Sequence, residues 1–215
     1  MKSDKSILFF GRKDHPDCYV VYDFLKNNFS DVFPIWNRAG DEIGWWQGDY
    51  IISYLSKYII PKHLIDSASV AAINFHPGSP QYPGIGCVNF ALYENADSFG
   101  VTCHFMDELP DTGGVIRERW FPIFKTDNVT TLLIRTYDYL LILFYEVCMD
   151  ILFNYPLESR DKWFRKPFTR KQLDELATIT PDMSKDEVYR RIRATTYKQW
   201  KPKVKLHEFE FEHTG

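Results

Sequence analysis

One short stretch, residues 70–84, constrains the fold of this chain more than any other. Residues 70–73 form an apolar run that predicts a buried strand, and Asn74 and His76 stand at its end. Side chains two residues apart on a strand point to the same face, so the amide and the imidazole project together. The next segment, residues 77–84, holds three prolines and two glycines and cannot continue as strand or helix. We therefore expect a rigid lip beside these two side chains.

A carboxylate completes this set of polar groups. Asp111 follows 37 residues after Asn74, within the sequence Pro-Asp-Thr-Gly. Amide, imidazole and carboxylate would supply an oxyanion donor, a base and the partner that orients the base. The competing interpretation is structural: Pro-Asp-Thr-Gly is also a good β-turn sequence, and Asn74 and His76 could be a strand-terminal amide and a hydrogen-bonded core histidine.

The spacing of apolar runs predicts an α/β fold with a mainly parallel sheet flanked by helices. We expect strands over residues 7–10, 32–36, 49–54, 70–75, 99–106 and 115–123, with helices from Pro16, after Pro61 and over 86–96. Pro34 favours an edge position for the second strand. Ligands of such sheets bind at the carboxyl ends of strands, where His76 and the loop at Gly11 both fall.

The second half of the chain is predicted to be mostly helical. Asn128 can cap a long helix, and further helices begin at Thr169 and Ser184. Residues 139–153 are apolar except for Glu146 and Asp150. This stretch is too short and too charged to span a bilayer, so we expect a core helix. The tail from Lys201 alternates charged and apolar residues, which indicates a strand at a sheet edge or at a dimer contact. We expect a core over residues 1–155 and a small helical and strand extension over 156–215, packed on the core.

Composition excludes several classes of partner. The net charge of −3 does not favour a nucleic-acid surface. The four cysteines are widely spaced, which predicts reduced, buried thiols in a cytosolic protein.

Residues 2–6 lead directly into a strand and lack the apolar core of a signal peptide, so we expect a cytoplasmic protein without a membrane partner. No spacing of histidine, cysteine and aspartate fits a zinc site, so no metal is expected; His15 and His63 should lie on the surface and His104 should be packed or supporting.

Three motifs, residues 74–78, 101–107 and 111–116, resemble those of the formyltransferases that use 10-formyltetrahydrofolate. That family includes glycinamide ribonucleotide, methionyl-tRNA and sugar N-formyltransferases. Residues 76–87, which contain the lip, are most similar to the sugar branch. The resemblance implies a Rossmann-like core and transfer of a formyl group from 10-formyltetrahydrofolate to the amino group of a nucleotide-linked amino-dideoxy sugar. A dTDP- or UDP-linked 4-amino-4,6-dideoxyhexose is the expected acceptor, for bacterial surface polysaccharide such as O-antigen.

The resemblance also implies roles for individual residues. Catalysis would rest on Asn74, His76 and Asp111, with His76 acting either as the base or, as imidazolium, as a further stabiliser of the oxyanion. The folate would lie between two loops, at Tyr58, Ile59 and Ile60 and at Asp107, Glu108 and Leu109. Gly78, Tyr82 and Gly84 would shape the sugar site.

The residues Gly11, Arg12 and Lys13 are predicted to hold the pyrophosphate of the acceptor. Two cations and a glycine at the carboxyl end of a strand suit that group, although a solvated basic turn is the competing interpretation. Relatives also dimerise through segments after the core, so a homodimer is a further expectation. Two other functions stay open: glycinamide ribonucleotide formyl transfer in purine synthesis, and a folate- or nucleotide-sugar-binding module without catalysis.

Overall fold

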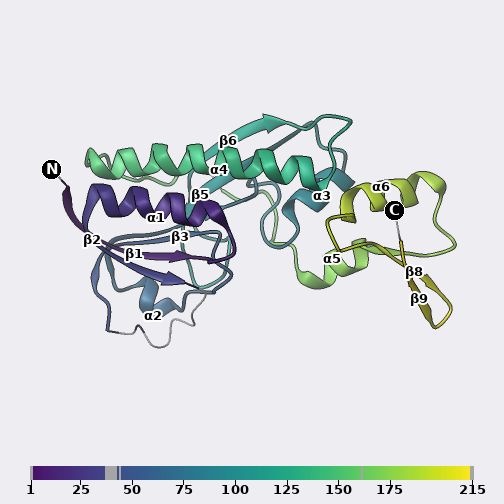
Figure 1. The fold of residues 1–215 in the computed structure, drawn as a ribbon, viewed down its shortest axis with the longest axis horizontal. Coiled ribbons are helices and arrows are strands. Elements are labelled where there is room, and N and C mark those ends of the chain that lie inside the picture. The colour runs from purple at the N-terminus through teal and green to yellow at the C-terminus, as the bar shows by residue number, and fades with distance from the viewer. Residues whose placement is uncertain (1, 37–42, 44, 161, 214–215) are drawn as a thin grey trace.

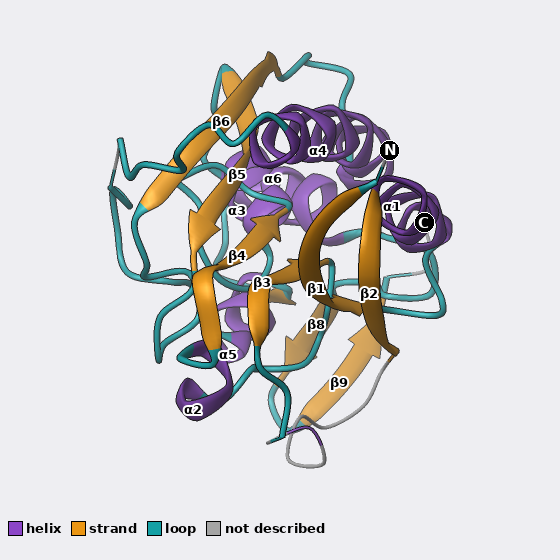
Figure 2. Cartoon of the chain, turned by 90° about the vertical axis from the view of Figure 1, so that its left-hand side faces the viewer, coloured by secondary structure: helices purple, strands orange, loops and turns teal. Residues whose placement is uncertain are grey.

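A six-stranded sheet forms the centre of the computed structural model, which describes all residues except 1, 37–42, 44, 161 and 214–215. The strand order is β2-β1-β3-β4-β5-β6, and Figure 2 shows these strands in orange. Their bounds are β1 Ser3–Gly11, β2 Phe29–Trp36, β3 Gly48–Tyr54, β4 Ala68–His76, β5 Ser98–Phe105 and β6 Val115–Pro122. As predicted, the strand that contains Pro34 lies at the edge.

The sheet is parallel over β2, β1, β3 and β4, and antiparallel at β4–β5 and β5–β6. The segment between β4 and β5, where the direction reverses, contains the helix α3 (Cys87–Tyr93). The mainly parallel α/β fold is thus confirmed, with one antiparallel end.

Two long helices cover one face of the sheet. α1 (Pro16–Asn28) and α4 (Val129–Leu152) run side by side across it in Figure 1. Ile7 and Phe9 of β1 pack toward these helices, while Leu8 and Phe10 face the opposite core, which includes the short helix α2 (Lys62–Ile65). This alternation is the two-residue period of a strand that is buried on both faces.

The predicted starts of three helices are confirmed. The side chains of Asn128, Thr169 and Ser184 each accept a hydrogen bond from the backbone N–H three residues ahead. They open α4, α5 (Arg170–Leu176) and α6 (Lys185–Thr195). All four cysteines are free and buried. Among the described residues, no helix combines the length and the apolar character that a bilayer span requires.

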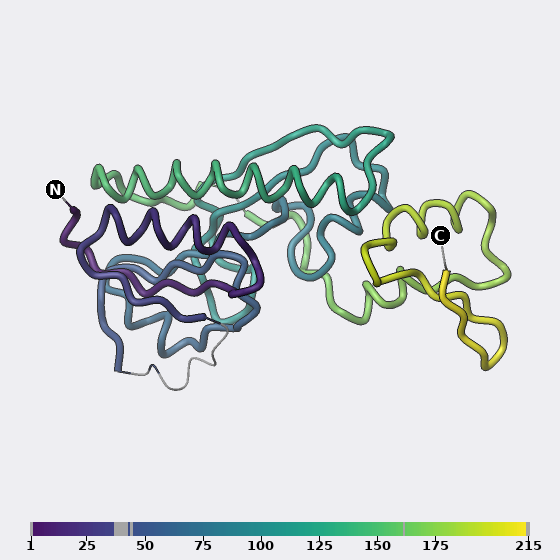
Figure 3. Tube along the Cα trace, viewed as in Figure 1, coloured from purple at the N-terminus to yellow at the C-terminus, as the bar shows by residue number. Residues whose placement is uncertain are grey.

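The C-terminal part lies at the opposite end of the molecule from the N-terminus (Figure 3). α6 packs on α3, where the side chain of Asn89 donates to the carbonyl of Ala194 at 2.6 Å. The predicted single tail strand is a hairpin instead: β8 (Lys203–Leu206) pairs with β9 (Phe209–Glu212) and with β7 (Thr178–Ile179). His207 turns the chain with a φ of 55°, a break that the charge alternation does not reveal.

Candidate active site

The register between β4 and β5 gathers three polar side chains on one face of the sheet. Asn74 lies directly opposite His104, and His76 lies opposite Thr102. Residues that face each other across antiparallel strands point to the same side, so His104 joins the amide and the imidazole that the sequence places together. Asn74 Nδ2 lies 3.1 Å from His104 Nε2.

Asp111 reaches this group from the loop between β5 and β6. Its Oδ2 atom lies 3.3 Å from His76 Nδ1, and its Oδ1 atom lies 3.4 Å from His104 Nε2. The backbone N–H of Gly84 also donates to Oδ2, at 2.8 Å. Asp111 adopts a left-handed backbone with a φ of 53°, a conformation that aspartate tolerates in turns. It is therefore both a turn residue and the carboxylate between two histidines.

The charges of this cluster are set by burial and by each other. Burial alone would raise the pKa of Asp111, but the two histidines and the Gly84 N–H hold that pKa well below its ordinary value. Burial lowers the pKa of His76, and the adjacent His104 lowers it further, against the opposing effect of the Asp111 carboxylate. Near neutral pH the site therefore pairs an ionised carboxylate with a neutral His76.

The lip holds His76 closely from behind. Gly78 is required at this contact, because a Cβ atom there would lie 2.5 Å from His76 Nε2. Thr102 Oγ1 donates to the Gly78 carbonyl at 2.7 Å, and the Tyr82 carbonyl lies 3.4 Å from His76 Nε2. The tyrosine ring itself is buried, and its hydroxyl donates to Glu94.

A strap, residues 156–160 and 162–169, crosses the lip and completes the wall of the site. Phe168 N–H donates to the Pro83 carbonyl and Ile85 N–H donates to the Phe168 carbonyl, both at 2.9 Å. Gly84, at φ 88°, allows this pairing, since a Cβ atom there would lie 2.4 Å from the Phe168 oxygen. The Phe168 ring stacks on Phe90 with centroids 3.7 Å apart.

Trp163 of the strap covers both histidines. Its ring meets those of His76 and His104 edge-on, with centroids 5.7 and 5.0 Å away. Its Nε1–H donates to the Gly113 carbonyl at 2.8 Å, which fixes the indole on the Asp111 loop. The sequence marks this segment only as basic and aromatic, and that composition does not show that one of its rings reaches the histidines.

A cavity of about 720 Å³ opens in front of the cluster. All three predicted catalytic residues line it, together with His104. Of the six predicted folate residues, Glu108 does not line the cavity. The other five do: Tyr58, Ile59, Ile60, Asp107 and Leu109. Ile59 and Leu109 are about two-thirds exposed, so two apolar side chains lie at the cavity without covering partners.

The predicted acceptor residues divide between the cavity and its surroundings. Arg12 and Gly84 line the cavity, whereas Gly11, Lys13, Gly78 and Tyr82 do not. Arg12 makes two hydrogen bonds of 2.7 Å to Asp14. The cavity also has polar and aromatic lining residues that the sequence did not single out for it: Ser53, Lys57, Tyr137, Phe168, Thr169 and Arg170.

The prediction for His15 is wrong. Its side chain is 12% exposed and lies edge-on against the Tyr137 ring, with centroids 4.5 Å apart, because α4 packs beside the start of α1. His63 is exposed, as predicted. Within the part of the chain that the structure describes, no group of three or more histidine, cysteine or acidic residues could hold a metal ion.

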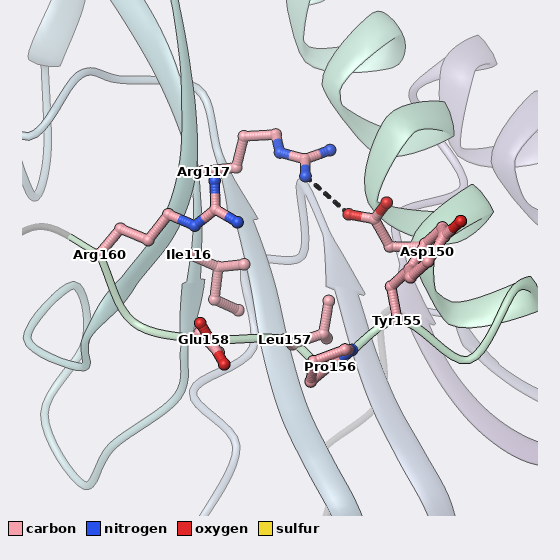
Figure 4. A pocket seen from close by; sticks show the side chains of 8 residues that line it. All are labelled: Ile116, Arg117, Asp150, Tyr155, Pro156, Leu157, Glu158 and Arg160. Carbon is pink, nitrogen blue, oxygen red and sulfur yellow. Dashed lines mark hydrogen bonds and ion pairs between the residues drawn. The ribbon is translucent and has the colours of Figure 1, made fainter.

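A second, smaller hollow of about 230 Å³ lies between α4, β6 and the strap (Figure 4). Arg117 reaches across it to Asp150 at 2.7 Å, and Arg160 and Tyr155 border it. Basic and acidic groups are mixed there, and none of its lining residues belongs to the cavity with the histidines.

Comparison with known proteins gives one family. The family model for formyl transferases matches residues 20–147, which is more than half of the chain. The methionyl-tRNA formyltransferase of Listeria monocytogenes serovar 1/2a (strain ATCC BAA-679 / EGD-e) is 35% identical over 107 residues, which cover 49% of this chain and 33% of that protein. The chain thus matches about a third of the length of that relative.

Two solved structures share the fold over nearly the whole chain. A 4-N formyltransferase from Francisella tularensis superposes with a TM-score of 0.79 at 19% identity, over 97% of this chain and 96% of that one. An N-formyltransferase from Helicobacter canadensis, in complex with folinic acid and dTDP-3-aminofucose, gives 0.75 at 19% identity, over 95% and 85%. The motif order, the Rossmann-like core and the family match agree, and this chain belongs to the formyl transferase family.

Proposed function

We propose that this chain is a sugar N-formyltransferase, which moves the formyl group of 10-formyltetrahydrofolate to the amino group of a nucleotide-linked amino-dideoxy sugar. The observation that carries the proposal is the convergence of Asn74, His76 and Asp111 at one cavity. The likeness to the Helicobacter canadensis enzyme, solved with folinic acid and a dTDP-amino sugar, supports the substrate class. A 4-amino-4,6-dideoxyhexose on dTDP or UDP is the acceptor we propose.

The residues present fit a flat folate ring. Ile59 and Leu109 offer apolar surface at the cavity, from two different loops, and Tyr58 stacks on Phe10 with centroids 6.0 Å apart. A planar, partly apolar ligand gains from covering such side chains. We therefore assign the folate to the side of the cavity formed by residues 58–60 and 107–109.

Asn74, His76 and Asp111 each have a separate role in the attack of the amine on the formyl carbon. When bound, 10-formyltetrahydrofolate supplies the electrophilic formyl carbon. Asn74 donates a side-chain N–H to the formyl oxygen, where negative charge develops; such a donor contributes about 3–4 kcal/mol. Neutral His76 accepts the proton that the amine loses and returns it to the folate nitrogen as the bond between that nitrogen and the formyl carbon breaks. Asp111 holds the ring and stabilises its imidazolium form, and such acid–base help contributes about 10²- to 10⁴-fold in rate.

The acceptor's pyrophosphate is assigned to the cationic side of the same cavity. Arg12 and Lys57 lie beside Asp14 at the carboxyl ends of β1 and β3, and Arg170 approaches from the strap side. Guanidinium and ammonium groups suit phosphate oxygens. We further propose a cytoplasmic reaction that feeds surface polysaccharide assembly, and a homodimer contact through the exposed Phe209 and Phe211 of the tail hairpin.

A panel of formyl-transfer assays tests the proposal. Purified protein with 10-formyltetrahydrofolate would be offered dTDP- and UDP-4-amino-4,6-dideoxyglucose, glycinamide ribonucleotide and methionyl-tRNA, with the folate product followed by absorbance. We expect turnover with an amino sugar, which Asn74→Ala and His76→Ala abolish and which the exposed His63→Ala leaves unchanged. Turnover with only the ribonucleotide or only the tRNA would overturn the sugar assignment, and folate binding without turnover would support a non-catalytic module.

A further inference from the structure

His104 occupies a place in the site that neither the acceptor nor the folate assignment uses. It is 2% exposed and lies directly across the strand pair from Asn74. Its Nδ1 atom lies 2.7 Å from the Phe105 carbonyl oxygen, which can only accept. Nδ1 therefore carries a proton, and the protonation of Nε2 is the one variable of this ring.

No single protonation state of His104 Nε2 suits both of its polar neighbours. This nitrogen lies 3.4 Å from Asp111 Oδ1, an acceptor, and 3.1 Å from the side-chain amide nitrogen of Asn74, a donor. An unprotonated Nε2 satisfies the amide N–H and leaves its lone pair facing the carboxylate. A protonated Nε2 satisfies the carboxylate and repels the amide N–H.

The amide can resolve this conflict by turning over. A rotation of 180° exchanges the oxygen and nitrogen ends of an asparagine side chain at almost the same positions. His104 is the side-chain partner of Asn74 within the described residues, and Asn74 lines the cavity. With Nε2 protonated, the amide oxygen faces His104 and the NH₂ group is free for the cavity.

We propose that His104 is a positioning residue whose proton decides which end of the Asn74 amide faces the formyl oxygen. This inference rests on the proposed function for its catalytic consequence, since Asn74 acts as oxyanion donor there. The charged form of His104 presents the donor, and the neutral form turns the amide oxygen toward the place where negative charge would develop. The groups that face His104 from neighbouring elements are the Asp111 carboxylate, the His76 ring and the uncharged indole of Trp163.

The ionised Asp111 favours the productive form. It is buried, and its Oδ1 atom has His104 Nε2 as its donor among the described residues. A buried carboxylate oxygen without a donor is costly, so the site gains from a proton on Nε2. The same proton disfavours a second positive charge on His76, which keeps that ring neutral as a base.

Nitrogen-15 NMR of the full-length protein tests the proposal without any substrate. Histidine and asparagine side chains would be labelled and assigned by their loss in His104→Gln and Asn74→Ala, and spectra would be recorded as a function of pH. We expect Nδ1 of His104 to stay protonated throughout, and the Asn74 NH₂ resonances to shift with the titration of Nε2 and to lose that shift in His104→Gln. The proposal would be overturned if the Asn74 resonances stayed constant while the protonation of Nε2 changed, or if Nδ1 were unprotonated.

Kinetics with dTDP-4-amino-4,6-dideoxyglucose supply the catalytic readout. Glutamine keeps a permanent N–H donor, so His104→Gln should retain kcat. His104→Leu should lower kcat by about 10²- to 10³-fold with the KM for 10-formyltetrahydrofolate unchanged. Equal losses of kcat in both variants would mean a merely structural role. If the wild type showed no turnover while the Asn74 resonances still responded to the protonation of His104, the proposed function would fail and the positioning role would stand.

Discussion

His76 Nδ1 lies 3.3 Å from Asp111 Oδ2, and both residues are more than nine-tenths buried. An imidazole held by a buried carboxylate is fixed in orientation and in tautomer, because the Nδ1 proton must face the carboxylate. Its Nε2 atom is then left to accept a proton, and the protonated ring can donate that proton's hydrogen bond to the Tyr82 carbonyl oxygen, 3.4 Å away. The relationship between these two residues is thus the basis of the base role that we assign to His76.

Replacing Asp111 by asparagine should lower kcat by about 10²- to 10⁴-fold, because the ring loses its charged partner while the side-chain shape is kept. Formyl-transfer rates at saturating folate check this, with Asp66→Asn as the matched control at an exposed carboxylate on the end of α2. A kcat within about threefold of the wild type would remove Asp111 from the mechanism.

Asp111 should also affect acid stability. Its folded pKa lies below its ordinary value of 3.8, so its ionised form contributes stability above about pH 4, and this contribution is lost as the pH falls toward the folded pKa. Asp111→Asn lacks this contribution at every pH. Thermal unfolding between pH 3 and 7 should therefore show a weaker fall in Tm with acid in the variant, and parallel curves for the two proteins would contradict this.

The acid limb of activity should lie below pH 6.5. Burial and the neighbouring His104 lower the pKa of His76 from its ordinary value of 6.5, so the neutral, base-competent ring persists to lower pH than a free imidazole. A pH profile of kcat/KM between pH 4.5 and 8 would show this, with buffer-matched controls for the stability of the formyl donor. An acid limb above 6.5 would mean that the base is another group.

Much of the fold was predictable because its signals are local. Apolar runs, the edge proline and the capping side chains each act within a few residues, and the strands and helix starts follow from them. The apolar pattern does not show the direction of β5 or the hairpin at His207, which turns at one left-handed residue. Those features are set by tertiary packing rather than by the periodicity of the sequence.

The candidate site shows the same division. Asn74 and His76 lie two apart on one strand, so their common face is visible in the sequence, and family motifs point to Asp111. His104 reaches the cluster through an antiparallel register, and Trp163 through a strap that crosses from the end of α4. A contact across 59 residues of chain, such as that of Trp163 with His104, leaves no spacing pattern to detect.

The backbone at Gly84 should be intolerant of a side chain. A Cβ atom there would lie 2.4 Å from the Phe168 carbonyl oxygen, and its φ of 88° is strained for any other residue. Gly84→Ala should cost more than the about 1–2 kcal/mol of left-handed strain and should displace the N–H that binds Asp111. Gly86→Ala is the matched control: its φ is also positive, but its Cβ meets the flexible end of Leu173. Urea unfolding that ranks Gly86→Ala as the more damaging change would refute this account.

Trp163 should control the water access of the two histidines. Trp163→Phe keeps an aromatic edge against them and loses the N–H donated to Gly113, which should cost about 0.5–1.5 kcal/mol of stability. Trp163→Ala should admit water to His76, raise its pKa toward 6.5 and move the acid limb of kcat/KM upward. Phe164→Ala, at a neighbouring ring that is 71% exposed, is the control and should leave the limb in place. If Trp163→Ala lowers stability without moving the limb, the indole is a clamp on the Asp111 loop and has no part in the burial that keeps His76 neutral.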